Sequence, residues 1–93
     1  MTNNYEAVVI LSQVIADEEK VAFAEKMKEL ITKSGELVNI DEWGKRTLAY
    51  EIKKQKEGFY IVFTFTAKPE SMSEMDRVLR LDERVLKYIV VKK

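Results

Sequence analysis

The chain has 93 residues, of which 46% are hydrophobic and 34% charged, and its 16 lysines and arginines balance its 16 aspartates and glutamates. This length and composition predict one globular domain over residues 1–93. Cysteine and histidine are absent, which excludes disulfides, thiolate nucleophiles, Cys/His zinc sites and catalysis by imidazole.

The zero net charge hides a gradient along the chain. Residues 1–44 carry a net charge of −5, residues 45–76 carry +1 and residues 77–93 carry +4. A polyanion would therefore meet the C-terminal part, although a solvated tail of mixed charge is the alternative. No apolar run approaches the roughly 20 residues that cross a bilayer, and the first residues lack the basic region of a signal peptide. We expect a cytoplasmic protein with no membrane association.

The first half of the chain predicts a strand, a helix and a second strand. Residues 5–11, YEAVVIL, have apolar side chains at both odd and even positions, as in a central strand that is covered on both faces. From Asp17 apolar residues recur at spacings of three and four, starting with Val21, and acidic residues 17–19 favour a helix start by capping and through the helix dipole. Gly35 suits the left-handed residue that ends a helix.

The second half predicts two strands, a helix and a final strand. Residues 36–52 form either one long strand bent at a bulge at Gly44 or a tight hairpin there. A polar loop at residues 53–58 leads into the strand FYIVFTFTA. Pro69 can open a helix whose apolar stripe runs from Met72 to Leu81, and residues 85–91, VLKYIVV, form the last strand.

This order, βαββαβ, predicts an α+β ferredoxin-like sandwich, with a four-stranded antiparallel sheet and two helices on one face. Parity does not tell which side chains face the helices. Either set leaves aliphatic and aromatic side chains on the other face, because Val8 opposes Val9 and Tyr60 opposes Phe59. An apolar surface of this kind usually marks a binding partner.

The strand EGFYIVFTF resembles the aromatic strand with which RNA-recognition modules stack bases. The match to that signature is confined to Gly58, Phe59 and Val62, while Glu57 and Ile61 stand where a basic residue and a stacking ring belong. We therefore expect its rings to lie in the core or on a protein-facing surface. Gly35, Gly44 and Gly58 fall in three separate turns and form no phosphate loop. We expect no enzyme, no catalytic residue, no metal, no cofactor and no small-molecule substrate.

The remaining candidates for binding are cations. Lys45 and Arg46 stand beside the predicted bend, and Arg77, Arg80 and Arg84 would share one side if the second helix continued that far. Guanidinium groups suit contact with phosphates. The alternative is a solvated helix face paired with neighbouring carboxylates.

The segments YEAVVIL, WGKRTLAYEIKK, GFYIVFTF and LRLDERVLKYIVVK, in this order, resemble the bacterial small-ribosomal-subunit protein six family over essentially the whole chain. The resemblance implies a structural protein of the ribosome that binds the central domain of small-subunit ribosomal RNA. It also implies a heterodimer with ribosomal protein eighteen of the small subunit. It places Lys45, Arg46 and Tyr50 in a basic bend and Arg80, Arg84 and Lys87 in a C-terminal basic segment. Lys92, in the same cationic run, completes the candidate RNA contacts.

Another class of function stays open from the residues alone. A ligand-sensing or oligomerising ferredoxin-like module would use the same uncovered sheet face for self-association.

Overall fold

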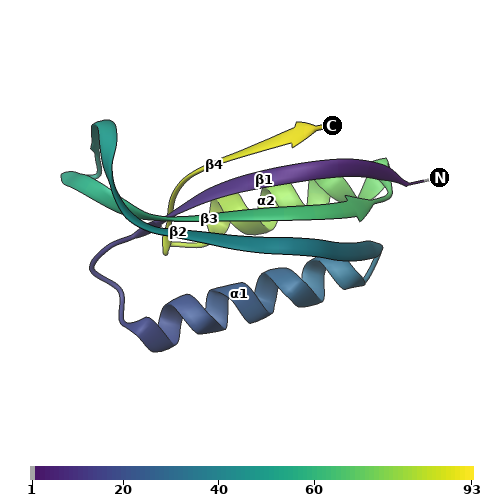
Figure 1. The fold of residues 1–93 in the computed structure, drawn as a ribbon, viewed down its shortest axis with the longest axis horizontal. Coiled ribbons are helices and arrows are strands. Elements are labelled where there is room, and N and C mark those ends of the chain that lie inside the picture. The colour runs from purple at the N-terminus through teal and green to yellow at the C-terminus, as the bar shows by residue number, and fades with distance from the viewer. Residues whose placement is uncertain (1) are drawn as a thin grey trace.

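The computed structural model describes residues 2–93. The elements follow one another as β1 (Asn3–Ser12), α1 (Asp17–Thr32), β2 (Gly35–Ile52), β3 (Gln55–Ala67), a short 3₁₀ turn (Pro69–Ser71), α2 (Met72–Leu81) and β4 (Val85–Lys92). The strands form one antiparallel sheet in the order β2-β3-β1-β4, and both helices pack against the same face of it (Figure 1). The predicted ferredoxin-like sandwich is confirmed.

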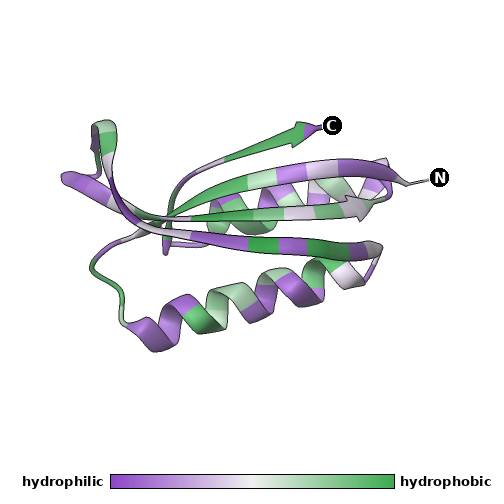
Figure 2. Ribbon diagram, in the orientation of Figure 1, coloured by the Kyte–Doolittle hydropathy of each residue, from purple (hydrophilic) through white to green (hydrophobic). Residues whose placement is uncertain are grey.

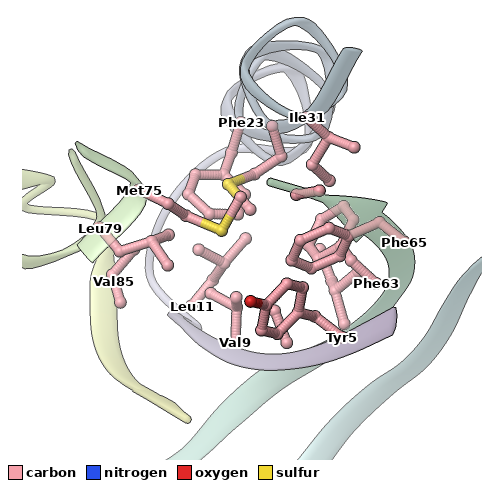
Figure 3. Close-up of a cluster of buried hydrophobic side chains, with 14 residues drawn as sticks. Tyr5, Val9, Leu11, Phe23, Ile31, Phe63, Phe65, Met75, Leu79 and Val85 are labelled. Carbon is pink, nitrogen blue, oxygen red and sulfur yellow. The ribbon is translucent and has the colours of Figure 1, made fainter. Parts of the chain in front are cut away.

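One parity of β1 and β3 faces the helices and forms the core. Phe63 and Phe65 of β3 are fully buried, as is Phe23 of α1, whose ring meets Phe63 edge-on at 6.4 Å between centroids. Tyr5 of β1 stacks on Phe65 at 5.7 Å (Figure 3). Ala7, Val9 and Leu11 complete the helix-facing set on β1. The rings of β3 other than Tyr60 are therefore core or core-packed residues, as expected, and do not form a base-stacking platform.

Both helices bury a narrower stripe than the periodicity predicts. Phe23, Met27 and Ile31 are the buried residues of α1, whereas Val21 is 62% exposed. Leu81, at the end of the stripe of α2, is 70% exposed. The acidic residues 17–19 do occupy the first turn of α1, but the N-cap is Ala16, which provides no side-chain cap. They favour the helix start through its dipole rather than by capping.

The bend at Gly44 is a bulge within one long strand, and the tight-hairpin alternative is wrong. The pairing of β2 with β3 shifts register between Glu42 and Gly44, and β2 continues to Ile52. Gly44 has a φ of 81°, which glycine adopts without a steric penalty.

The predicted polar loop at residues 53–58 is wrong. Ile52 pairs with Gln55, so the connection is a two-residue turn of Lys53 and Lys54, both with positive φ. Gln55 is already the first residue of β3, and its side-chain oxygen accepts hydrogen bonds from the Ser12 hydroxyl at 3.0 Å and the Gln13 N–H at 3.2 Å. These bonds hold the start of β3 against the end of β1.

Gly35 does not end α1 in a left-handed conformation, as the sequence suggested. The residue after α1, Lys33, is right-handed helical (φ −63°, ψ −32°), and Gly35 is already the first residue of β2, opposite Ala67. A Cβ atom on Gly35 would lie 1.8 Å from the carbonyl oxygen of Thr66. Glycine is required here by the close approach of two backbones, not by a turn.

Gly35→Ala is expected to lower the free energy of unfolding by about 2–3 kcal/mol, because the two backbones must move apart. Gly44→Ala is the matched control: its Cβ would meet nothing within 4 Å, so the cost is that of a left-handed alanine, about 1 kcal/mol. Urea denaturation of both variants measures the difference. A larger loss in Gly44→Ala would contradict this account of Gly35.

Candidate nucleic-acid interface

At the bulge in β2, an aromatic pair of which Trp43 is the exposed member and an arginine lie on the sheet face opposite the helices, here called the open face. The rings of Trp43 and Tyr60 are nearly parallel, 10° apart, with centroids separated by 6.2 Å. The Arg46 guanidinium lies 5.1 Å from the centre of the Trp43 ring. The indole N–H donates to Asp41 at 2.9 Å, which holds the ring in place. Arg46 thus has a preferred orientation that is set by an aromatic ring rather than by a carboxylate.

Lys45 and Arg46, predicted together, lie on opposite faces of the sheet. Lys45 pairs with the helix-facing Phe59, and its ammonium group lies 3.8 Å from a carboxylate oxygen of Glu57. Arg46 pairs with Gly58 on the open face. Adjacent strand residues point to opposite faces, so one rigid ligand on the open face could contact Arg46 but not Lys45.

The structure does bring Tyr50 and Lys87 together. The Lys87 ammonium donates to the Tyr50 hydroxyl at 2.9 Å and lies 5.2 Å from the centre of that ring. This contact joins the far end of the β2–β3 hairpin to β4. Leu48, in the same hairpin, is 8% exposed, and it lies beside Gly58 with Ile10 of β1. The end of the hairpin therefore covers one end of the open face.

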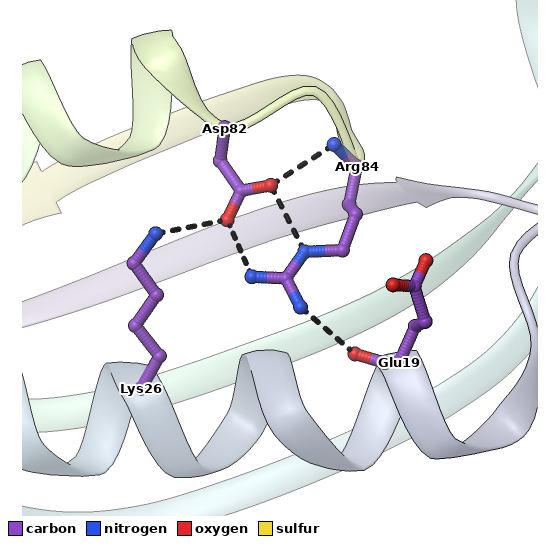
Figure 4. A network of polar contacts seen from close by, with 4 residues as sticks. All are labelled: Glu19, Lys26, Asp82 and Arg84. Atoms are coloured by element: carbon purple, nitrogen blue, oxygen red, sulfur yellow. Dashed lines mark hydrogen bonds and ion pairs between the residues drawn. The ribbon is translucent and has the colours of Figure 1, made fainter.

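Arg84 is part of a bonded network between the α2–β4 connection and α1 (Figure 4). Its Nε and Nη2 donate to the two carboxylate oxygens of Asp82 at 3.0 and 2.9 Å, and Nη1 donates to the carbonyl oxygen of Glu19 at 3.3 Å. Lys26 of α1 also donates to Asp82 at 3.2 Å. The guanidinium lies 5.6 Å from the Phe23 ring centre. Arg84 therefore stabilises the fold.

The protonation of this network follows from its contacts. Burial opposes ionisation of Asp82, but the hydrogen bonds from Arg84 and Lys26 outweigh it and hold the pKa of that carboxyl at about 2, below its usual 3.8. The hydrogen bond with Asp82 raises the pKa of Arg84 above its ordinary value. Both groups are charged at neutral pH, and the network loses its stabilising effect only as the pH falls from about 4 to about 2.

The second helix does not continue far enough to place Arg77, Arg80 and Arg84 on one side. α2 ends at Leu81, and Asp82 is extended (ψ 115°) because its carboxylate accepts the backbone N–H of Arg84 at 3.0 Å. Arg80 remains on α2, with its side chain 64% exposed and its guanidinium 3.9 Å from Asp76. Lys92 pairs with Tyr5 at the other end of β4, beside a hollow that Met72 and Asp76 line. The seven candidates do not form a single site.

Exposed apolar or aromatic side chains on the open face include Trp43, Ile89 and Val91. Trp43 is 44% exposed, and Ile89 and Val91 of β4 are 49% and 45% exposed. Ile89 pairs with Val8 of β1, so the apolar surface continues onto the neighbouring strand. Figure 2 colours most of β4 as hydrophobic.

Sequence reasoning missed Lys53. The residue was assigned to a polar loop, whereas the structure places it beside Arg80 and Lys87 in one hollow. The available signal was the density of lysines between the two strands, without any asparagine or glycine at the turn.

Within residues 2–93, neither helix is long and apolar enough to cross a bilayer, and no group of three or more acidic side chains could hold a metal ion.

Comparisons with known proteins agree over nearly the full chain. The family model described as Ribosomal protein S6 matches residues 4–92. A curated relative, "Small ribosomal subunit protein bS6" of Caldanaerobacter subterraneus subsp. tengcongensis, is 40% identical over 90 residues, which cover 96% of this chain and 95% of the relative. A protein of the same name from Clostridium kluyveri is 45% identical over 89 residues, covering 95% and 94%.

The fold comparison gives the same result. The crystal structure of 30S ribosomal protein S6 from Thermotoga maritima matches with a TM-score of 0.94 and 25% sequence identity. The match covers 100% of this chain and 89% of that chain.

Arg84→Ala is expected to lower the free energy of unfolding by about 2–3 kcal/mol, because it leaves the largely buried Asp82 carboxylate with fewer partners. Arg46→Ala, the control, removes an exposed cation–π contact and should cost less than about 1 kcal/mol. Thermal or urea unfolding at pH 7 measures both. Equal stability of the two variants would show that the Arg84 network contributes little.

Proposed function

The chain belongs to the ribosomal protein S6 family, and from this membership we propose that it binds the central domain of small-subunit ribosomal RNA together with ribosomal protein eighteen of the small subunit. As a member of this family it is a cytoplasmic component of the small ribosomal subunit. The role is structural and involves no catalysis. The observation that carries the proposal is an apolar sheet face, free of helices, that is bordered by cations.

The open face supports a protein partner. Ile89 and Val91 expose about half of their surface on β4, and burying them beneath a partner would remove apolar area from water at about 25 cal/mol per Å². Heterodimer formation would use this area. The aromatic pair of Trp43 and Tyr60 adds rigid contact surface, of the kind enriched in interface centres.

The charge distribution supports joint rather than independent RNA binding. The chain has zero net charge, so its long-range attraction for a polyanion is weak. Affinity for RNA grows with the number of phosphates neutralised, and a partner would add cations to those of this chain. The proposed RNA contacts are Lys45, Arg46, Tyr50, Arg80, Lys87 and Lys92. Arg84 is left out of this set because all three of its guanidinium nitrogens already donate hydrogen bonds within the protein.

The same open face favours one competing function, which is self-association through Ile89 and Val91. Two copies joined by this surface would form an oligomerising module. Size-exclusion chromatography with light scattering at micromolar concentration distinguishes the two. A monomer that shifts only when protein eighteen is added supports the heterodimer, whereas a stable homodimer favours the alternative.

The RNA affinity of the isolated chain and of the heterodimer tests the proposal. A fragment of the central domain of the ribosomal RNA should bind the heterodimer at least about tenfold more tightly, a difference of about 1.4 kcal/mol. Arg46→Ala should weaken heterodimer binding to RNA, whereas Lys33→Ala, a matched change of an exposed residue on the α1 side, should not. Filter binding or fluorescence anisotropy measures both. Tight RNA binding by the isolated chain, unchanged by the partner, would contradict the proposal.

A further inference from the structure

Three cations from three separate elements line one hollow at the hairpin end of the molecule. Lys53 comes from the β2–β3 turn, Arg80 from α2 and Lys87 from β4, and the rest of the lining is Leu79, Val85, Leu86 and Tyr88. Among residues 2–93, no carboxylate lines it. The volume of about 270 Å³ holds a phosphate group with several waters, since a water occupies about 30 Å³ in the liquid. We propose that this hollow binds a backbone phosphate of the RNA, an inference that rests on the proposed function.

The contacts around the hollow leave its cations free to bind an anion. Lys87 donates to the Tyr50 hydroxyl rather than to a carboxylate. Arg80 lies 3.9 Å from Asp76, too far for a hydrogen bond. Asp76 also accepts a hydrogen bond from the Tyr88 hydroxyl. This bond weakens the attraction of the Asp76 carboxylate for Arg80. The Arg80 guanidinium can therefore present its forked donors to a phosphate, beside two lysine point charges.

The turn that carries Lys53 is an independent indication of a role for this charge. Lys53 and Lys54 adopt φ values of 48° and 64°. Asparagine and glycine are the residues that two-residue turns of this kind favour, and a lysine at positive φ costs about 1 kcal/mol. Backbone strain of this kind gathers at functional sites. Two lysines in place of Asn-Gly keep positive charge at the tip of the hairpin at the expense of local stability.

The arrangement favours RNA over a free phosphate ion. Figure 1 shows the joined ends of β2 and β3 projecting beyond the start of β4. Between residues 45 and 56 the hairpin carries five cations and one carboxylate. Lys54 and Lys56 are exposed and continue the charge beyond the hollow. One small anion cannot contact all of them, whereas successive phosphates of one strand can.

The test uses the salt dependence of RNA binding by the complete heterodimer. The hollow variant is Lys53→Gln/Arg80→Gln/Lys87→Gln. The matched control is Lys33→Gln/Arg77→Gln/Lys68→Gln, which removes the same charges and residue types from exposed positions elsewhere. If the hollow holds a phosphate, the slope of log K against log salt concentration becomes about one unit shallower in the hollow variant alone. Its affinity at 0.15 M salt should fall about tenfold relative to the control.

Equal changes in both triple variants, or no change in the hollow variant, would overturn the proposal. Lys53→Gln alone changes the exposed turn and leaves the Tyr50–Lys87 contact intact. This single variant should also weaken RNA binding without changing the melting temperature. Titration of the ¹⁵N-labelled protein with inorganic phosphate tests the other source of the ligand. Tight phosphate binding at the hollow with an unchanged RNA slope would assign the site to a free anion and refute the RNA contact. Failure of the wild-type heterodimer to bind RNA would instead refute the proposed function.

Discussion

Side-chain alternation along β1 and β3 is the constraint on which the rest of this structure depends. It directs Ala7, Val9 and Leu11 toward the helices, together with Phe63 and Phe65. Because the phenylalanines of β3 are used in this core, the open face keeps the aliphatic side chains of the other parity and one aromatic pair. A shift of one residue in register would exchange the two faces. The core thus determines that this sheet exposes an apolar surface rather than a row of stacking rings.

The cations fall into two groups, those that hold elements of the fold together and those that remain available on the surface. Arg84 is held by Asp82 and the Glu19 carbonyl, and it joins the α2–β4 connection to α1. Arg46, Arg80 and Lys87 have weaker partners or neutral ones. A charge with no carboxylate at hydrogen-bonding distance contributes little to stability and is available to a ligand. By this criterion we propose that the hairpin end of the molecule, and not the C-terminal strand as a whole, faces the RNA.

Local patterns in the sequence predict the elements, their order and the bulge at Gly44, because helical and strand periodicities and a glycine in a strand are short-range signals. Long-range contacts account for the errors. Gly35 is required by the Thr66 backbone across the sheet, and the turn at Lys53 is held by bonds between Gln55 and the end of β1. One error was avoidable: an aspartate two residues before Arg84 is a local signal for a turn that ends the helix. The hollow joins three elements that no spacing in the sequence relates.

Oxidative footprinting of the assembled small ribosomal subunit tests the central claim, that the open face is the docking surface, most directly. Trp43 and Ile89 report on this face, and Val21, which is 62% exposed on α1, reports on the helix side. Hydroxyl-radical labelling followed by mass spectrometry compares each side chain in the free chain and in the subunit. Trp43 and Ile89 are expected to become strongly protected on assembly, while Val21 stays reactive. Protection of Val21 while Trp43 and Ile89 remain as reactive as in the free chain would contradict that claim.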